Sequence, residues 1–186
     1  IPECGNRRLT FYLAMEEYIP QVLKDYLMPG EIENEAFFLW QVQPTVIFGR
    51  NQVMEVEVNI DYCKSKGIQL FRRKSGGGCV YADMGNIMIS YITTSTDVTF
   101  TFDKFLQRIA LVFRQMGLNA ERSGRNDILI NGKKVSGNAF FHKKDISIVH
   151  GTMLFDSDFD ELTKAITPSE DKIKSNKALP PSSIRV

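Results

Sequence analysis

Three consecutive glycines, at positions 76–78, follow the basic run Arg72-Arg73-Lys74. Glycine loses more conformational freedom on folding than any other residue, so an ordered Gly-Gly-Gly turn needs a compensating role. Close approach of the backbone to a ligand is one such role, because successive N–H groups can converge on an anion while Arg and Lys supply mobile positive charge. The run predicts a phosphate cradle. An ordinary hairpin beside a solvated basic face is the alternative.

Length and composition indicate one globular domain. The chain has 186 residues, of which 43% are hydrophobic and 24% charged, and its net charge is +1. This near balance gives no general reason to bind nucleic acid or an acidic membrane, and no apolar run approaches the length of a membrane span. Cys4, Cys63 and Cys79 are too widely spaced for a disulfide framework or a zinc site, which favours a reducing, cytoplasmic setting.

Periodicity and turn residues predict alternating helices and strands in the first half of the chain. An amphipathic helix begins near Thr10, and Pro20 either ends it or opens a second short helix that runs to Leu27. Residues 37–48 read as two strands joined by a tight turn at 43–44. The remaining expectations are a helix over 60–66 with Asn59 as N-cap and Gly67 as terminator, and strands on both sides of the glycine turn.

The second half begins with the strongest helical pattern in the chain. Apolar residues recur at three and four positions from Phe102 to Met116, and Gly117 ends the pattern. Asn131-Gly132 between apolar runs predicts a hairpin. A strand over 146–154, a short capped helix over 156–166 and a loosely ordered, polar, Lys-rich segment over 167–186 complete the prediction.

The common nucleotide motifs are absent. No G-x-x-x-x-G-K-[ST] occurs, and Tyr81 occupies the third glycine position of a dinucleotide-binding turn. Three polar segments instead interrupt an otherwise apolar pattern: the basic glycine turn, residues 123–127 and residues 134–139. Together they offer backbone donors, an arginine, a carboxylate able to hold Mg²⁺ and a lysine, which are the groups that acyl activation by a nucleotide requires.

Considered jointly, these segments resemble the lipoate–protein ligases within the wider biotin/lipoate ligase and octanoyltransferase superfamily. The similarity covers nearly the whole chain and rests on residues in the family's order, namely Arg72-Arg73-x-Ser75-Gly76-Gly77-Gly78-x-Val80-Tyr81-x-Asp83-x-Gly85-Asn86, Ser123-Gly124-Arg125-Asn126-Asp127, Lys134-Val135-Ser136-Gly137-x-Ala139 and His150-Gly151-Thr152, with Phe38-Leu39-Trp40 and Gly49-Arg50 before them.

The resemblance implies an α/β (α+β) fold with a mixed β-sheet flanked by helices, as a ligase-type catalytic domain over residues 1–166. It also implies ATP-dependent ligation of lipoate through a lipoyl-AMP intermediate, with ATP and Mg²⁺. The acceptor is a lysine of a lipoyl-carrier domain, from 2-oxoacid dehydrogenase complexes or the glycine cleavage H protein. The implied location is cytoplasmic, with no nucleic-acid or membrane partner. Many members carry a smaller C-terminal domain, which a chain ending at Val186 lacks.

The resemblance also implies roles for individual residues. Lys134 is the expected catalytic group, touching both lipoate and the adenylate phosphate, and Asp127 is the expected metal ligand. Nucleotide-binding residues are Arg73, Gly78, Cys79, Val80, Tyr81, Asn126, Asp127 and Lys134; lipoate-binding residues are Phe38, Trp40, Gly77, Lys134 and His150; secondary candidates are Arg72, Ser75, Gly76 and Asp83.

Departures from the family pattern leave two alternatives. Cys79 replaces a common alanine, and an octanoyl or lipoyl transferase could use a thiol beside positive charge as its nucleophile. A small cysteine that packs like alanine is the simpler interpretation. A non-catalytic protein that binds lipoate or nucleotide is the second alternative, motivated by the missing C-terminal domain.

Overall fold

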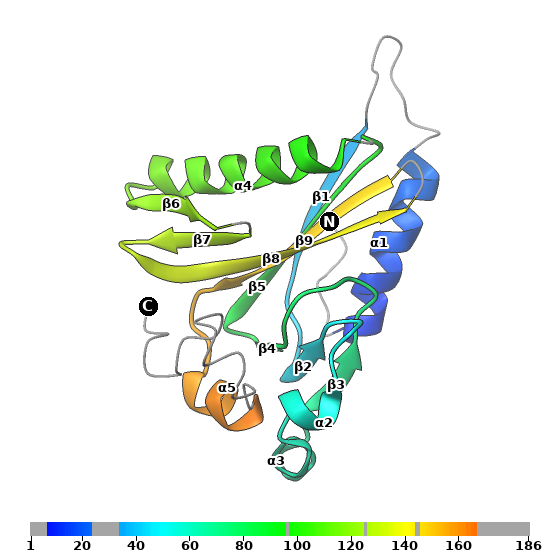
Figure 1. The fold of residues 1–186 in the computed structure, drawn as a ribbon, viewed down its shortest axis with the longest axis vertical. Coiled ribbons are helices and arrows are strands. Elements are labelled where there is room, and N and C mark those ends of the chain that lie inside the picture. Colours follow the sequence, from blue (N-terminus) through cyan, green and yellow to red (C-terminus); the bar gives the residue numbers. More distant parts are fainter. Residues whose placement is uncertain (1–6, 24–33, 96, 125, 144–145, 167–186) are drawn as a thin grey trace. The chain divides into compact units, whose positions relative to one another are not determined.

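The fold is described from a computed structural model that places residues 7–23, 34–95, 97–124, 126–143 and 146–166 (Figure 1). The chain divides into two compact units, each made of two separate segments. Unit 1 comprises residues 1–40 and 87–153, and unit 2 comprises residues 41–86 and 154–186. The predicted loose segment 167–186 lies outside the described residues, as does the predicted helix end at Leu27.

Unit 1 is built on a six-stranded sheet. The strand order is β1-β5-β9-β8-β7-β6, and the β1–β5, β9–β8, β8–β7 and β7–β6 pairs are antiparallel. The strands are β1 (Glu35–Trp40), β5 (Asn86–Thr93), β6 (Ala120–Ser123), β7 (Asp127–Ile130), β8 (Lys133–Lys143) and β9 (Ile146–Leu154). At the β7–β8 turn, Asn131 and Gly132 both have positive φ, of 51° and 76°, which is the conformation that a two-residue hairpin turn requires.

Two helices pack on opposite faces of this sheet. Helix α4 (Val98–Gln115) begins at Asp97, whose side chain accepts from Phe100 N, and lies along β6 and β7 in Figure 1. Between α4 and the sheet lies the main hydrophobic core, which consists of Ile89, Tyr91, Phe105, Leu106, Phe113, Ala120, Ile128, Val135 and Val149. Helix α1 (Leu9–Leu23) packs on the other face, where Tyr12 stacks on Trp40 with ring centroids 4.8 Å apart.

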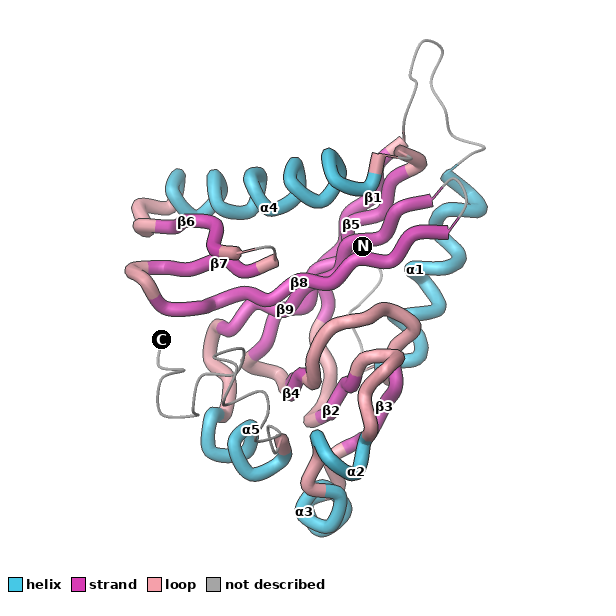
Figure 2. Tube along the Cα trace, viewed as in Figure 1, coloured by secondary structure: helices cyan, strands magenta, loops and turns pink. Residues whose placement is uncertain are grey.

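Unit 2 contains a mixed three-stranded sheet. Strand β2 (Thr45–Phe48) pairs in parallel with β3 (Gln69–Arg72) and antiparallel with β4 (Val80–Ala82). Figure 2 shows these three strands next to one another. Three short helices accompany it: α2 (Met54–Glu57), α3 (Ile60–Lys66) and α5 (Phe159–Ala165). The unit has its own core of Val46, Phe48, Val58, Cys63, Ile68, Tyr81 and Ala165. The α/β class with a mixed sheet and flanking helices is therefore confirmed.

Several local predictions are confirmed and others need correction. Asn59 caps α3 by accepting from Tyr62 N, and Gly67 ends it with φ of 67°. The prediction that Pro20 interrupts the first helix is wrong, because α1 continues to Leu23 with Pro20 buried inside it. Burial of the ring offsets the one intrahelical hydrogen bond that proline removes.

The other corrections concern strand partners and helix limits. Strands β1 and β2 both exist, but they do not pair with each other, because each belongs to a different sheet. The last helix begins at Phe159 rather than at 156, because Asp158 is its N-cap. Strand β6 and helix α2 were not predicted.

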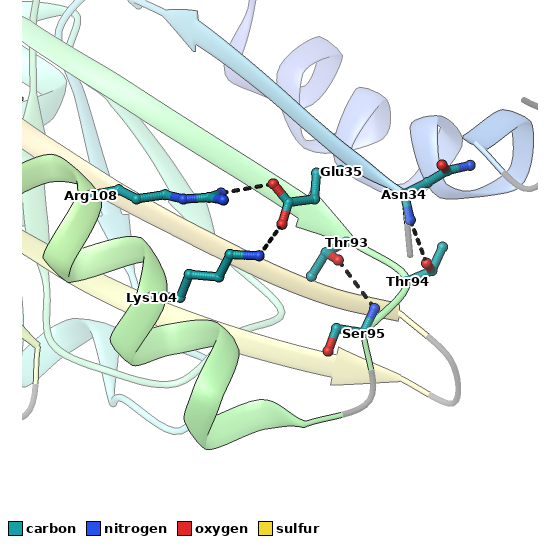
Figure 3. Close-up of polar contacts among 7 residues, drawn as sticks. All are labelled: Asn34, Glu35, Thr93, Thr94, Ser95, Lys104 and Arg108. Atoms are coloured by element: carbon teal, nitrogen blue, oxygen red, sulfur yellow. Dashed lines mark hydrogen bonds and ion pairs between the residues drawn. The ribbon is translucent and has the colours of Figure 1, made fainter. Parts of the chain in front are cut away.

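One ion-pair cluster ties the start of β1 to α4 (Figure 3). Glu35 accepts from Lys104 Nζ at 2.6 Å and from Arg108 at 2.7 Å. Burial pushes the pKa of Glu35 upward, but the hydrogen bonds from Lys104 and Arg108 outweigh it and lower that pKa from 4.5 to about 2. Nearby, Asn34 N donates to Thr94 Oγ1 and Ser95 N donates to Thr93 Oγ1, which fixes the chain at both strand ends.

A depressed carboxyl pKa stabilises the folded state above pH 4.5, and this stabilisation is lost as the pH falls towards 2. Since Glu35 is partly exposed and its charges are screened, the contribution is about 1 kcal/mol or less. We expect Glu35→Gln to lower the urea midpoint near neutral pH and to leave it unchanged at about pH 2. The control is Glu121→Gln, at an exposed position of β6. An equal difference between Glu35→Gln and the parent at both pH values would contradict this.

Candidate functional site

In unit 2, the side chain of Arg73 lies inside the glycine loop and is only 6% exposed. Its Nε donates to Ser75 Oγ at 3.1 Å, its Nη1 to Ile47 O at 3.0 Å, and its Nη2 to Gly76 O and Gly78 O at 2.7 Å each. Burial lowers the pKa of Arg73. The planar guanidinium therefore holds the loop from within by binding its carbonyl oxygens.

This arrangement sets the direction of the loop's amides. A trans peptide is planar, so its N–H points away from its C=O. Because the carbonyls of Gly76 and Gly78 face Arg73, the N–H groups of Gly77 and Cys79 point away from it. Gly77 has φ of 91°, a conformation that favours glycine. That these amides bind a phosphate stays a prediction.

Arg72 also binds backbone carbonyls. Its Nη1 donates to the carbonyl oxygens of Gly49, Arg50 and Gln52, and its guanidinium lies 4.5 Å from the centre of the Phe48 ring. The expectation that this basic run supplies mobile positive charge is therefore wrong for both arginines. Their charge neutralises carbonyl dipoles and fixes the loops at 49–52 and 73–78.

The residues after the glycines have packing and capping positions. Tyr81 is buried in the core of unit 2, and Cys79 packs against that core. The carboxylate of Asp83 accepts from Gly85 N at 2.8 Å and from Asp158 N at 2.9 Å, which joins the loop after β4 to the start of α5. Tyr81 and Asp83 also line a cleft of about 680 Å³ in this unit.

In unit 1, the structure brings Lys134 and Asp127 together across the β7–β8 hairpin. The Lys134 Nζ lies 2.8 Å from Asp127 Oδ1, and the two side chains are 47% and 28% exposed. A register shift between Ile128 and Leu129 makes Val135 a bulge, so Asp127 stands opposite Gly137. Bulges commonly redirect a side chain beside a functional site.

A second polar group adjoins this pair. Asn126 Nδ2 donates to Asn138 O at 2.9 Å, and Asn138 Nδ2 donates to Asn126 O at 3.0 Å and to Ser136 Oγ at 3.2 Å. Asn138 lies across Gly151 of β9, where a Cβ would come within 1.9 Å of its Oδ1. The glycine of the His-Gly-Thr motif is therefore needed for close packing of this amide.

The predicted lipoate residues Trp40 and His150 are linked through two residues that the sequence analysis did not identify. Trp40 Nε1 donates to Ser90 Oγ at 2.8 Å, and Ser90 Oγ donates to Glu16 Oε1 at 2.5 Å. His150 Nδ1 lies 3.2 Å from Glu16 Oε2. Glu16 comes from α1 and is 4% exposed. A charged residue on the buried face of an amphipathic helix is the signal that could have revealed it.

Ladder register shows that the candidate residues of unit 1 share one face of the sheet. Residues opposite each other in a ladder lie on the same face, as do alternate residues of one strand. Asp127 is opposite Gly137, Leu129 opposite Lys134, and Gly137 opposite Thr152. Asp127, Lys134, Gly137 and His150 therefore lie on one face by register. Phe38, Trp40 and Ser90 share a face of the β1–β5 pair. It is the same face of the sheet, the α1 face, because Glu16 of α1 contacts both Ser90 and His150. The α4 core occupies the other face.

The predicted site residues thus form one group in each unit. Lys134, Asp127, Asn126, Trp40 and His150 belong to unit 1, and the glycine loop with Arg73 and Asp83 belongs to unit 2. That the two groups meet around one nucleotide stays a prediction.

Two general features of the described residues bear on function. Among the described residues, there is no group of three or more His, Cys, Asp and Glu side chains that could hold a metal ion. None of the described helices has both the length and the apolar character needed to cross a membrane.

Comparison with known proteins assigns the family. The family model described as "Lipoyl protein ligase A/B catalytic domain" matches residues 9–184. The chain belongs to this family. It is also 40% identical over 164 residues to the lipoate-protein ligase LplJ of Bacillus subtilis, a match that covers 88% of this chain and 47% of the relative. The chain therefore spans about half the length of the curated relatives it matches.

Solved structures agree with this assignment. Plasmodium falciparum LipL1 in complex with lipoate is 30% identical, with a TM-score of 0.74, covering 88% of this chain and 50% of that one. A lipoate-protein ligase A bound with ATP is 26% identical, with a TM-score of 0.71 and coverages of 92% and 72%. A bipartite lipoate protein ligase from Thermoplasma acidophilum, described with its E2 lipoyl domain, is 27% identical, with a TM-score of 0.73 and coverages of 98% and 74%.

Proposed function

We propose that this chain carries out the ATP-dependent attachment of lipoate to a lysine of a lipoyl-carrier domain. The observation that carries the proposal is the Lys134–Asp127 pair, which stands on the same sheet face as Trp40 and His150 in a chain of the lipoyl protein ligase family. The lipoate complex of one similar protein and the ATP complex of another support the two substrates.

The reaction has two steps. A carboxylate oxygen of lipoate attacks the α-phosphorus of ATP, a P–O bond breaks, and pyrophosphate leaves. The amine of the carrier lysine then attacks the carbonyl carbon of lipoyl-AMP, loses a proton, and displaces AMP. Both steps build negative charge at phosphate or carbonyl oxygens, where the fixed ammonium group of Lys134 would stabilise it. The amides of Gly77 and Cys79 would bind phosphate oxygens of the nucleotide.

Mg²⁺ is proposed to accompany ATP. The described residues hold no cluster of three or more His, Cys, Asp and Glu side chains that could bind the ion without the nucleotide. This fits a Mg²⁺ ion that is bound largely by nucleotide phosphates, since Mg²⁺ commonly uses one or two carboxylates and keeps several waters. When bound, the ion would neutralise phosphate charge.

The proposed acceptors are lipoyl domains of 2-oxoacid dehydrogenase complexes and the glycine cleavage H protein, and the proposed location is the cytoplasm. The E2 lipoyl domain described with the similar Thermoplasma acidophilum ligase supports the first of these acceptors.

The assay combines the chain with lipoate, ATP, Mg²⁺ and an apo lipoyl domain. Mass spectrometry should show carrier that is heavier by one lipoyl group, together with release of pyrophosphate. A parallel reaction supplied with synthetic lipoyl-AMP and no ATP separates transfer from activation. Modification by free lipoate that proceeds equally well without ATP would contradict the proposal. Binding of lipoyl-AMP by calorimetry, with no turnover in either reaction, would favour a non-catalytic binding protein.

Cys79 tests the alternative of octanoyl or lipoyl transfer through a thiol. Because Cys79 packs against the apolar core of unit 2, we expect Cys79→Ala to keep the lipoylation rate within about threefold of the parent, as for a small packing residue. The matched control is Cys63→Ala, at a fully buried cysteine of the same core. Loss of all activity in Cys79→Ala, but not in Cys63→Ala, would establish the transferase instead.

A further inference from the structure

We propose that Asp127 is a positioning residue, which holds the ammonium group of Lys134 in one place on the sheet surface. The proposal rests on the function proposed above, because it gives Asp127 a role in the same reaction. It differs from the role of metal ligand that the family resemblance implies for Asp127.

The hairpin geometry brings the two side chains together. Lys134 starts opposite Leu129, two residues along the strand from Asp127, and lies on the same face. The bulge at Val135 places Gly137, rather than Ser136, directly opposite Asp127. The side chain of Lys134 therefore passes over Gly137, which has no side chain, on its way to Asp127.

Gly137 provides the room for this path. A Cβ at this position would lie 3.3 Å from both Cε and Nζ of Lys134, and 3.9 Å from Asp127 Oδ1. The end of the lysine side chain thus passes beside Gly137, where a larger residue would crowd it, and reaches the carboxylate at 2.8 Å. Gly137 beside the end of the lysine and the Asp127 carboxylate at its Nζ together define one position for the ammonium group.

The Lys134–Asp127 pair serves to place the ammonium group and not to stabilise the fold. Both side chains are partly exposed, and ion pairs of this kind add little to folding stability. Lysine has a flexible four-carbon stem, so an unanchored ammonium group would sample many positions. A catalytic charge that is displaced by about 1 Å can cost 10²-fold in rate, so the anchor matters for chemistry.

The surroundings favour this role over that of a metal centre. One oxygen of the Asp127 carboxylate already faces a cation, because Lys134 Nζ lies against Oδ1.

The first test measures Lys134 directly and needs no activity. Side-chain ¹⁵N NMR of the full chain, with Lys134→Arg used for assignment, gives the order parameter of the Cε–Nζ bond. Asp127→Asn should lower this order parameter. Asp103→Asn should not, although it removes a carboxylate from another ion pair of unit 1, with Arg122. An unchanged order parameter in Asp127→Asn would overturn the proposal.

The second test measures catalysis at increasing Mg²⁺ concentrations. Asp127→Asn should lower kcat by about 10- to 100-fold with a smaller change in KM for ATP, and Asp127→Glu should recover part of the loss. Recovery of Asp127→Asn by added Mg²⁺ alone would identify a metal ligand and overturn the positioning role. If the parent chain does not lipoylate at all, the proposed function fails, while the NMR measurement still decides the role of Asp127.

Discussion

Lys134→Ala is expected to slow the lipoylation of an apo carrier by about 10²- to 10³-fold, the loss typical of removing one preorganised charge donor. The ammonium group is held at 2.8 Å from Asp127, on the sheet face that also carries Trp40 and His150. In the proposed reaction, it is the charged group that would meet negative charge in both the activation and the transfer step. The loss should therefore appear in kcat for both half-reactions.

Lys133→Ala is the matched control, because Lys133 is the preceding residue of β8 and is exposed. Adjacent residues of a strand point to opposite faces, so this change removes an equal charge from the wrong side of the sheet. Single-turnover rates with ATP and with synthetic lipoyl-AMP would separate the two steps. Equal rates in Lys134→Ala and the parent would show that another group carries the charge.

Local structure could be predicted where its cause is local. The Asn131-Gly132 turn, the Asn59 cap and the apolar period of α4 each depend on residues a few positions apart, and the structure confirms them. A hairpin with its turn at Asn131-Gly132 also places Lys134 and Asp127 on neighbouring strands. The bulge at Val135, which sets what lies beneath the lysine, has no comparable signature in the sequence.

Contacts between distant segments could not be predicted in this way. Glu16 meets Ser90 and His150, which are 74 and 134 residues away. Periodicity assigns Glu16 to a helix, but it does not say which strand faces that helix. For the same reason, β1 and β2 were recognised as strands while their separation into two sheets was not.

The basic run shows a different limit. Composition gives the charge of Arg72 and Arg73, but not the direction in which each guanidinium points. The carbonyls of the neighbouring loops compete with any ligand for these donors, and in this structure the carbonyls bind them. Family resemblance implies a nucleotide contact for Arg73, and the geometry adds an internal role that the motif alone does not reveal.

Arg73→Met is expected to lower the free energy of unfolding of unit 2 by about 2–4 kcal/mol, because it leaves the buried carbonyl oxygen of Ile47 and the loop carbonyls of Gly76 and Gly78 without their donor. Arg73→Lys should recover little of this loss, since one ammonium group cannot span acceptors that a planar fork reaches together. Lys74→Met, at the next and exposed position, should change the free energy by less than about 0.5 kcal/mol.

Hydrogen exchange of the amides in β2 and β4, combined with calorimetric titration of ATP, separates the two roles of Arg73. If the guanidinium mainly holds the loop, Arg73→Met speeds exchange throughout unit 2 even without ligand, and ATP affinity falls because the amides of Gly77 and Cys79 are no longer aligned. If it mainly binds phosphate, exchange stays at the parent rate and only the ATP affinity falls. Because the guanidinium donates four hydrogen bonds to the loop and one to Ile47 O of β2, we expect the first result.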